Sequence, residues 1–163
     1  MKTLLLLRHA KSSWKQPELA DHDRPLNKRG KRTAPLMGAL LQDEDLIPDL
    51  IFCSSAVRAH TTALLVAKAC NYRGKIKQTG AFYLAGPEDY VEVLRQVADK
   101  HARVLVVGHN PGLEALIEAL TGEAMVMPTA ALAYIELSLK RWRDLDMNTE
   151  CKLLNVWRPK KLE

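Results

Sequence analysis

The chain has 163 residues, of which 47% are hydrophobic and 26% are charged. These fractions are close to globular averages, and they exclude a disordered, collagenous or coiled-coil protein. The length predicts one domain that spans residues 1–163. The 24 Lys and Arg residues outnumber the 19 Asp and Glu residues, and the net charge of +5 favours an anionic partner.

Cysteine usage and apolar runs predict where the protein resides. Cys53, Cys70 and Cys151 are an odd number of cysteines without CxxC or CxxH spacing. This pattern indicates a reducing compartment and argues against a disulfide framework or a zinc site. The apolar run at residues 4–7 is too short for a signal peptide, and no run approaches the roughly 18 apolar residues that span a bilayer. We therefore expect a cytoplasmic protein with no membrane partner.

The first predicted element is a strand at residues 4–7. A short, continuous apolar run that ends at a charged pair is typical of a strand buried on both faces. Residues 28–42 follow with helical spacing, and Asn27 is the expected N-cap. Pro35 lies inside this segment, so we expect it to kink the helix or to delay its start.

The middle of the chain continues this alternation of strands and helices. Residues 50–53 form a second apolar run, and residues 56–71 have the Ala-rich face of a helix. A third helix is predicted at residues 87–100, with proline at its first position and acidic residues in its first turn. A third apolar run, residues 104–107, predicts another buried strand.

The last part of the chain completes the predicted fold. Residues 111–120 have helical spacing with Asn110 as the expected cap. Residues 131–139 and 152–157 show the alternation of half-buried strands. Strands that alternate with helices predict an α/β fold, namely a three-layer sandwich with a mostly parallel central sheet flanked by helices.

Arginine and histidine residues follow the predicted parallel strands at the point where each strand ends. Arg8 and His9 come directly after the first strand, and His109 comes directly after the third. Arg58 lies just beyond the second strand, at the opening of a helix. Because ligands bind beyond the carboxyl ends of parallel strands, we expect these four side chains to meet at one edge of the sheet.

Two arginines and two histidines are suited to a phosphoryl group. Arginine presents a planar fork of donors that matches phosphoryl oxygens. One imidazole can attack phosphorus through an unprotonated nitrogen, and a second, protonated imidazole can donate to a phosphoryl oxygen. Helix N-termini near Ala56 and Pro111 would add backbone donors. Since side chains already supply positive charge, we expect no metal and no cofactor.

Each of these residues also has an ordinary structural interpretation. An Arg-His pair after a strand is usually a surface turn, and a lone histidine at a strand end is usually a hydrogen-bonded structural residue. His22, His60 and His101 show no partner pattern and are expected to be structural or surface residues. The basic groups at residues 28–32 and 158–161 are scattered along the chain, which favours solvated faces over a nucleic-acid footprint.

The ordered motifs resemble the histidine phosphatase (phosphoglycerate mutase-like) superfamily and, within it, the phosphohistidine phosphatase SixA branch. The segments that carry the resemblance are LLLLRHAKSSW at residues 4–14, DRPLNKRG at 23–30, CSSAVRAHTTA at 53–63, VLVVGHNPGLEALI at 104–117 and MPTAALA at 127–133. Each motif alone is weak, but the ordered set is specific. The resemblance implies a phosphoglycerate mutase-like fold and phosphatase activity.

The resemblance also implies roles for individual residues. His9 would be the nucleophile that is transiently phosphorylated, and Arg8, Arg58 and His109 would bind the phosphoryl group. Ser12 or Ser13 would add a hydroxyl contact to the substrate.

The chain departs from the family pattern at two places. Ala10 replaces the glycine that usually follows the Arg-His pair, which matters only if that position needs a positive φ. Asn110 stands where acid-phosphatase relatives carry a proton-donating acid. Glu88 and Asp89 lie near the segment that supplies a glutamate in mutase-like relatives, so Glu88 is a candidate substrate-binding residue, but both also fit ordinary first-turn helix acids.

The absence of an evident acid favours phosphohistidine in a protein as the substrate, because imidazole leaves phosphorus with less need for protonation than an alkoxide. The runner-up is a phosphatase of small phosphate esters or nucleotides. The non-enzyme alternative is a module that binds a phosphate or a phosphoprotein without turnover. We expect a monomer that does not bind nucleic acid.

Overall fold

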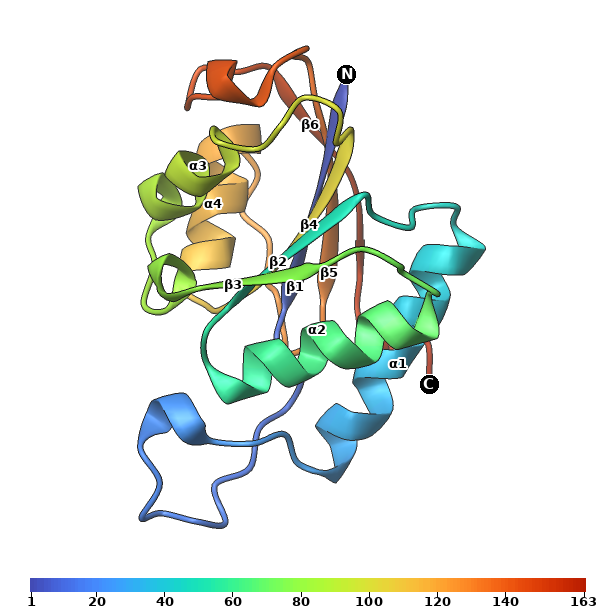
Figure 1. The fold of residues 1–163 in the computed structure, drawn as a ribbon, viewed down its shortest axis with the longest axis vertical. Helices are drawn as coiled ribbons and strands as arrows, with labels where there is room; N and C mark the ends of the chain where they lie inside the picture. The colour runs from blue at the N-terminus through green and yellow to red at the C-terminus, as the bar shows by residue number, and fades with distance from the viewer.

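Six strands and four α-helices make up the framework of the computed structural model, which describes residues 1–163 (Figure 1). The strands are β1 (Lys2–Arg8), β2 (Leu50–Ser54), β3 (Ile76–Thr79), β4 (Arg103–Gly108), β5 (Leu132–Leu137) and β6 (Cys151–Trp157). The helices are α1 (Lys28–Asp43), α2 (Val57–Ala69), α3 (Pro87–Leu94) and α4 (Gly112–Thr121). Short 3-10 helices are η1 (Asp21–Asp23), η2 (Gly80–Phe82), η3 (Trp142–Asp144) and η4 (Pro159–Lys161).

The strands form one mixed sheet in the order β3-β2-β4-β1-β5-β6. The pairs β3–β2, β2–β4 and β4–β1 are parallel, whereas β5 is antiparallel to both β1 and β6. The carboxyl ends of β1, β2 and β4 therefore lie at the same edge of the sheet. This arrangement places Arg8, Ser54 and Gly108 at that edge.

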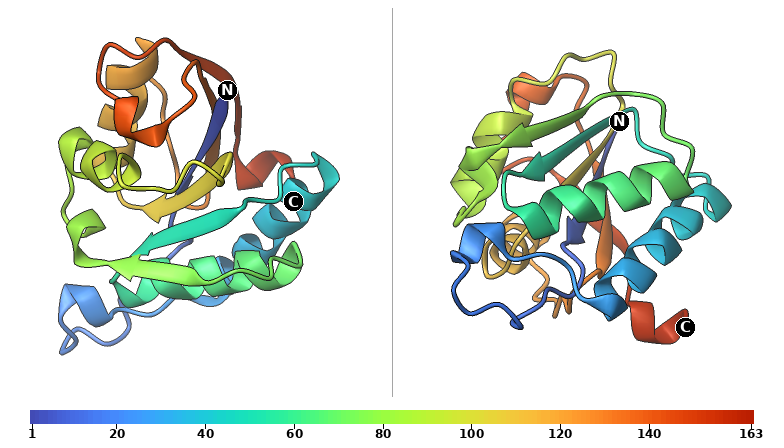
Figure 2. Two further views of the ribbon diagram at one scale, coloured as in Figure 1. Left: turned by 45° about the horizontal axis from the view of Figure 1, so that its top comes forward. Right: turned by 60° about the horizontal axis from the view of Figure 1, so that its bottom comes forward.

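Both faces of the sheet are covered by helices, which explains the continuous apolar run of β1. Leu4 and Leu6 pack into one core together with α3 and α4, while Leu5 and Leu7 pack into the other core together with α1 and α2. The views in Figure 2 show the two helix pairs on opposite sides of the sheet. The predicted three-layer α/β sandwich with a mostly parallel sheet is confirmed.

The observed helices and strands agree with the predictions from the sequence to different degrees. Asn27 caps α1, because its side chain accepts a hydrogen bond from the amide of Gly30. Pro35 does not delay this helix, which begins at Lys28. The prediction for α3 was too long, since the helix ends at Leu94 rather than at residue 100. Strand β3 was not predicted. None of the four α-helices combines the length and apolarity needed to cross a lipid bilayer.

Gly30 lets α1 pack against the segment that follows His9. A Cβ atom at position 30 would lie 2.2 Å from the carbonyl oxygen of Lys11. The same carbonyl accepts a hydrogen bond from the amide of Asn27, at 3.0 Å. A larger residue than glycine would therefore push this segment away from the helix and displace the loop beside the sheet edge.

Candidate active site

His9 stands at the end of the central strand β1 with one ring nitrogen fixed by the backbone. Its Nδ1 lies 2.8 Å from the carbonyl oxygen of Ala10, which can only accept, so Nδ1 carries the proton and donates. The Nε2 atom is left unprotonated. Burial is the main reason that the pKa of His9 falls from 6.5 to about 3, and the positive charges of nearby Arg58 and Arg8 act in the same direction. His9 is therefore a neutral imidazole at physiological pH.

The turn after His9 is also held by α2. The amide of Ala10 donates to Thr62 Oγ1 at 3.0 Å, and the Thr62 hydroxyl donates to the carbonyl oxygen of Arg58 at 2.7 Å. Ala10 itself is fully buried and does not adopt a positive φ. The replacement of the expected glycine by Ala10 therefore introduces no backbone strain at this position.

His109 lies beside His9, with 5.0 Å between the two ring centroids. Burial, followed by the charge of Arg58, lowers the pKa of His109 from 6.5 to about 4. The second imidazole was expected to be protonated, and this expectation is corrected for the free protein, in which His109 is neutral. A neutral imidazole still offers one N–H donor, and its position depends on the partner of the other nitrogen.

Ser54 determines which nitrogen of His109 carries the proton. Its hydroxyl oxygen lies 2.8 Å from His109 Nε2 and accepts from the amide of Ala56 at 3.2 Å. Ser54 is fully buried, and His109 Nε2 is the acceptor within reach of its O–H. The hydroxyl therefore donates to Nε2, which leaves the proton of His109 on Nδ1 as a donor.

Arg8 and Arg58 bring two guanidinium groups to the same edge of the sheet. Arg8 donates to the carbonyl oxygen of Met127 at 3.1 Å, while its Nε is buried without a hydrogen-bond partner. Arg58 donates to the main-chain oxygen of Asp21 at 2.7 Å and to Asp21 Oδ2 at 3.0 Å. Each arginine is thus held by the protein, and both side chains line the cavity described below.

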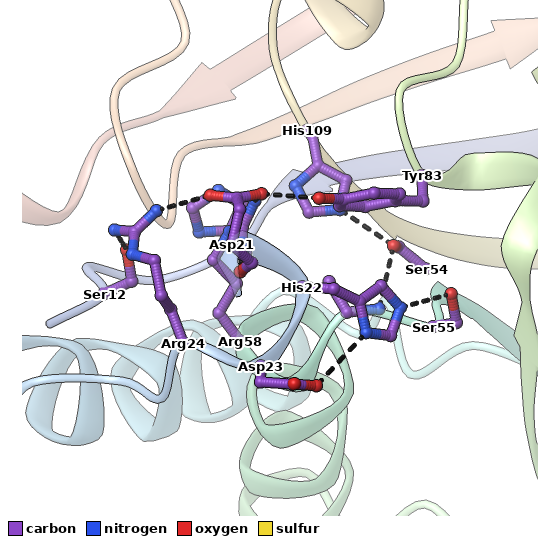
Figure 3. A network of polar contacts seen from close by, with 12 residues as sticks. Ser12, Asp21, His22, Asp23, Arg24, Ser54, Ser55, Arg58, Tyr83 and His109 are labelled. Carbon is purple, nitrogen blue, oxygen red and sulfur yellow. Dashed lines mark hydrogen bonds and ion pairs between the residues drawn. The ribbon is translucent and has the colours of Figure 1, made fainter. Parts of the chain in front are cut away.

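Asp21 connects three other side chains, those of Arg24, Arg58 and Tyr83, and we call these four residues the Asp21 clamp (Figure 3). Its carboxylate accepts from Arg24 at 2.9 Å, from Arg58 at 3.0 Å and from the Tyr83 hydroxyl at 2.7 Å. The hydrogen bond from Tyr83, and then those from the arginines, hold the pKa of Asp21 well below its usual range. Asp21 is therefore ionised and has no proton to give to a leaving group.

A cavity of about 410 Å³ opens between these groups. It brings together the four expected site residues Arg8, His9, Arg58 and His109, and it also contacts Ser12. The other residues that line it are Lys11, Trp14, Arg24, Tyr83, Leu84, Ala85, Asn110, Pro111 and Thr129. Three guanidinium groups, the ammonium group of Lys11 and two imidazoles thus line one space, and none of the 14 lining residues is Asp or Glu.

The two serines that follow the Arg-His pair are placed differently. Ser12 lines the cavity, and its hydroxyl oxygen accepts a hydrogen bond from Arg24. Ser13 does not line the cavity, and its carbonyl oxygen accepts from Arg24 Nε at 3.2 Å. Both serines therefore hold Arg24, and Ser12 is the one that can reach a ligand.

Glu88 and Asp89 stand in the exposed first turn of α3 and do not line the cavity. Asp89 accepts a hydrogen bond from the amide of Gly86 at 2.8 Å, as a residue that caps a helix start does. The structure thus supplies a local role for Asp89, and it places Glu88 outside the space that His9 and His109 share. No group of three His, Cys, Asp or Glu side chains is arranged to hold a metal ion.

Comparison with known proteins agrees with this geometry. Residues 4–81 match the family described as histidine phosphatase superfamily (branch 1). The fold is similar to that of a protein from Agrobacterium tumefaciens provisionally designated phosphohistidine phosphatase SixA, with a TM-score of 0.83 and 30% sequence identity, over 97% of this chain and 98% of that one. The chain belongs to the histidine phosphatase superfamily.

Two further proteins resemble this histidine phosphatase chain in sequence or in fold. The uncharacterized protein Rv1276c of Mycobacterium tuberculosis is 32% identical over 151 residues, which cover 86% of this chain and 92% of that protein. A protein histidine phosphatase SixA complexed with tungstate shares the fold, with a TM-score of 0.85 at 21% identity over 99% of both chains. Membership of the family and its SixA-like structure support phosphatase activity.

Four residues of the site were given no role from the sequence: Asp21, Arg24, Ser54 and Tyr83. Asp21 and Arg58 are 37 positions apart, and Asp21 and Tyr83 are 62 positions apart. Arg24 lies within one of the motifs of the histidine phosphatase family, and Ser54 directly follows a predicted buried strand. The positions of Arg24 and Ser54 in the sequence could therefore have indicated a role in the site. The contacts of Asp21 and Tyr83 depend on tertiary structure and gave no such indication.

Replacing Ser54 by alanine is expected to lower kcat about tenfold, because His109 loses the hydrogen bond that keeps its proton on Nδ1. Ser55→Ala is the matched control, since the Ser55 hydroxyl contacts His22 at 2.9 Å (Figure 3) and Ser55 does not line the cavity. Steady-state hydrolysis of p-nitrophenyl phosphate measures both variants. Equal kcat values for Ser54→Ala and Ser55→Ala would show that Ser54 does not position His109.

Acidification is expected to destabilise the free protein through the two buried imidazoles. Folding lowers the pKa of His9 to about 3 and that of His109 to about 4, from an ordinary value of 6.5. The unfolded chain therefore binds more protons below pH 6.5. Stability is fully present above that pH and is lost as the pH falls, by about 2 kcal/mol per imidazole between about pH 7.5 and about pH 5.

Urea unfolding at the two pH values measures this loss. The control is the double variant His9→Asn, His109→Asn, in which the two titrating groups are absent. Its free energy of unfolding should depend less on pH than that of the wild type, by about 4 kcal/mol over the same interval. The same pH dependence in both proteins would contradict the lowered pKa values.

Proposed function

We propose that this chain is a metal-independent phosphatase that works through a phosphohistidine intermediate on His9 and removes phosphate from phosphohistidine in proteins. One observation carries the proposal. The cavity presents the unprotonated Nε2 of a neutral imidazole together with Arg8, Arg58 and His109, and it has no Asp or Glu in its lining. This set can bind and accept a phosphoryl group, but it has no carboxylic acid to protonate a poor leaving group.

The proposed first step transfers the phosphoryl group from the substrate to His9. Nε2 of His9 forms a bond to phosphorus while the bond from phosphorus to the substrate nitrogen breaks, and its electron pair returns to the substrate imidazole. That imidazole departs neutral when its other nitrogen carries a proton. Arg8 and Arg58 balance the charge on the phosphoryl oxygens, and His109 Nδ1 donates to one of them.

The second step regenerates the enzyme. Water attacks the phosphoryl group on His9 as the bond between phosphorus and Nε2 breaks. The electron pair of that bond returns to Nε2, and both protons of the water leave with the product as H2PO4−. The hydrogen bond from Nδ1 to the carbonyl oxygen of Ala10 keeps the ring in the same orientation through both steps. His9 therefore returns to the neutral state with Nε2 free for the next substrate.

The mouth of the cavity favours a protein substrate over a small one. Trp14 and Leu84 both line the cavity, yet 74% and 84% of their surfaces are exposed. The guanidinium carbon of Arg24 lies 3.2 Å from the ring centroid of Trp14, which orders this exposed indole. Exposed apolar side chains around a polar site are typical of surfaces that bind another protein.

The test is dephosphorylation in the presence of EDTA, with a phosphohistidine-bearing protein and p-nitrophenyl phosphate as alternative substrates. We expect the phosphohistidine protein to be hydrolysed with the higher kcat/KM. Glu88→Gln should be nearly normal on both substrates, because Glu88 lies outside the cavity. Efficient turnover of small phosphate esters without turnover of phosphohistidine would contradict the proposal. A large loss of activity towards p-nitrophenyl phosphate in Glu88→Gln would favour the phosphatase of small esters.

A further inference from the structure

A second hollow adjoins the catalytic cavity on the side of Arg8. It has a volume of about 730 Å³ and shares Arg8, Lys11 and Thr129 with the lining of the catalytic cavity. Its remaining lining residues are Arg29, Pro128, Arg158, Pro159, Lys160 and Lys161. We call this hollow the basic groove. A ligand that occupies the catalytic cavity can extend into the groove past Arg8.

The basic groove carries an uncompensated positive charge. Six of its nine lining residues are Lys or Arg, and none is Asp or Glu. Glu163 forms an ion pair with Arg29 at 3.1 Å, but the other five cationic residues have no carboxylate within ion-pair distance. Residues that were expected to lie on separate solvated faces, Arg29 and the segment 158–161, are thus brought together beside the proposed phosphoryl site.

One arginine of the groove, Arg158, is anchored to the same loop as Arg8. Arg158 donates twice to the carbonyl oxygen of Val126, at 2.8 and 3.2 Å, while Arg8 donates to the carbonyl oxygen of the next residue, Met127. Pro159 is buried and begins η4, which presents the exposed Lys160 and Lys161. The guanidinium of Arg158 and the backbone of η4 therefore have a defined position relative to Arg8, which partly preorganises this surface for anions.

The composition of the groove distinguishes among anionic ligands. No aromatic residue lines it, so it lacks the stacking platform by which single-stranded nucleic acid is bound. Lysine and arginine side chains spread along an open groove suit several separate carboxylates. The exposed Trp14 and Leu84 at the mouth of the adjoining cavity add the apolar contacts of a protein interface.

We infer that the basic groove binds acidic side chains that flank the phosphohistidine of a protein substrate. This inference rests on the proposed function, and it narrows the substrate to phosphohistidine on an acidic segment. The phosphoryl group enters the catalytic cavity, and neighbouring Asp or Glu residues of the substrate lie against Lys160, Lys161 and Arg158. Electrostatic attraction of this kind raises the rate of productive encounter and weakens with salt.

Two synthetic phosphohistidine peptides of equal length test the inference, one with Asp and Glu around the phosphohistidine and one with Ser and Gln at those positions. For the wild-type protein we expect kcat/KM to be about tenfold higher for the acidic peptide at low ionic strength. The ratio should fall towards one as NaCl is raised to about 0.5 M. The double variant Lys160→Ser, Lys161→Ser should lose most of this ratio at low salt.

The matched control is Lys140→Ser, Arg143→Ser, which removes the same charge from two exposed residues at the opposite end of the sheet. It should keep the full preference for the acidic peptide. Turnover of both peptides with a ratio near one in the wild type, or an unchanged ratio in the groove variant, would overturn the inference while the proposed function stands. No turnover of either peptide would overturn the proposed function and the inference together.

Inorganic pyrophosphate serves as the probe for a different occupant, the second phosphate of a small substrate. If pyrophosphate inhibits the wild type at least tenfold more strongly than the groove variant, and both peptides are hydrolysed equally, then the groove binds a second phosphate. That result would replace the acidic segment by a small bisphosphorylated ligand. Equal inhibition of both proteins, together with a preference for the acidic peptide, supports the inference as stated.

Discussion

Replacing His9 by asparagine is expected to reduce phosphatase turnover by a factor on the order of 10⁴ or more, because the variant has no nitrogen that can accept the phosphoryl group. The side chain of asparagine is close in size to the ring portion that contacts Ala10, so the fold should persist. Steady-state hydrolysis of p-nitrophenyl phosphate and of a phosphohistidine protein measures the loss. Rapid quenching should trap an acid-labile phosphoenzyme in the wild type and none in the variant.

His60→Asn is the matched control for this experiment. His60 lies on α2, two positions from Arg58, and does not line the cavity. The His60→Asn variant should retain turnover within about twofold of the wild type, because the substitution lies outside the cavity. Substantial turnover and a trapped phosphoenzyme in His9→Asn would assign the nucleophile to another residue, with the neighbouring His109 as the first candidate.

The second large effect is expected for Arg58→Ala, which should lower kcat/KM by about 10² to 10³-fold, since a preorganised donor to the phosphoryl oxygens is lost. Arg58→Lys should recover only part of this loss, because an ammonium group cannot replace the planar fork of two donors. The measurement is kcat/KM for p-nitrophenyl phosphate, accompanied by thermal unfolding to verify that each variant is folded.

Loss of Arg58 also breaks the Asp21 clamp, so a control must separate the two effects. Asp21→Asn removes the carboxylate charge but leaves in place Arg58 and its hydrogen bond to the main-chain oxygen of Asp21. We expect this variant to lose less than about tenfold in kcat/KM. Equal losses in Asp21→Asn and Arg58→Ala would mean that Arg58 acts by holding the loop rather than by contacting the substrate.

The sheet edge was the part of the site that sequence could predict. Arg8, His9 and His109 directly follow buried apolar runs, and parallel strands must bring such positions together. The cap of α1 was equally local, since it depends on Asn27 and the amide of Gly30. These predictions succeeded because the pattern along the chain and the tertiary structure impose the same arrangement.

The errors have tertiary causes. Residues 95–100 were predicted to continue α3, but Val97 turns into the core and Asp99 accepts a hydrogen bond from the amide of Trp142. Strand β3 is a short edge strand that pairs only with β2, and its sequence IKQT has no apolar alternation to reveal it. Asp21 begins η1, and its contacts with Arg58 and Tyr83 join residues far apart in the chain, so no local pattern could predict these two contacts.

The residues that line the cavity differ in how well they can tolerate substitution. The proposed nucleophile lies at the end of β1, a strand that is paired on both sides and buried on both faces. Other lining residues lie in loops: Trp14 and Arg24 precede α1 and are held by their mutual stacking and by the Asp21 carboxylate, whereas Leu84 precedes α3 and is largely exposed. Substitutions in these loops can therefore change substrate specificity without altering the phosphoryl-binding residues at the sheet edge. One fold can in this way acquire different substrates while it keeps the same reaction.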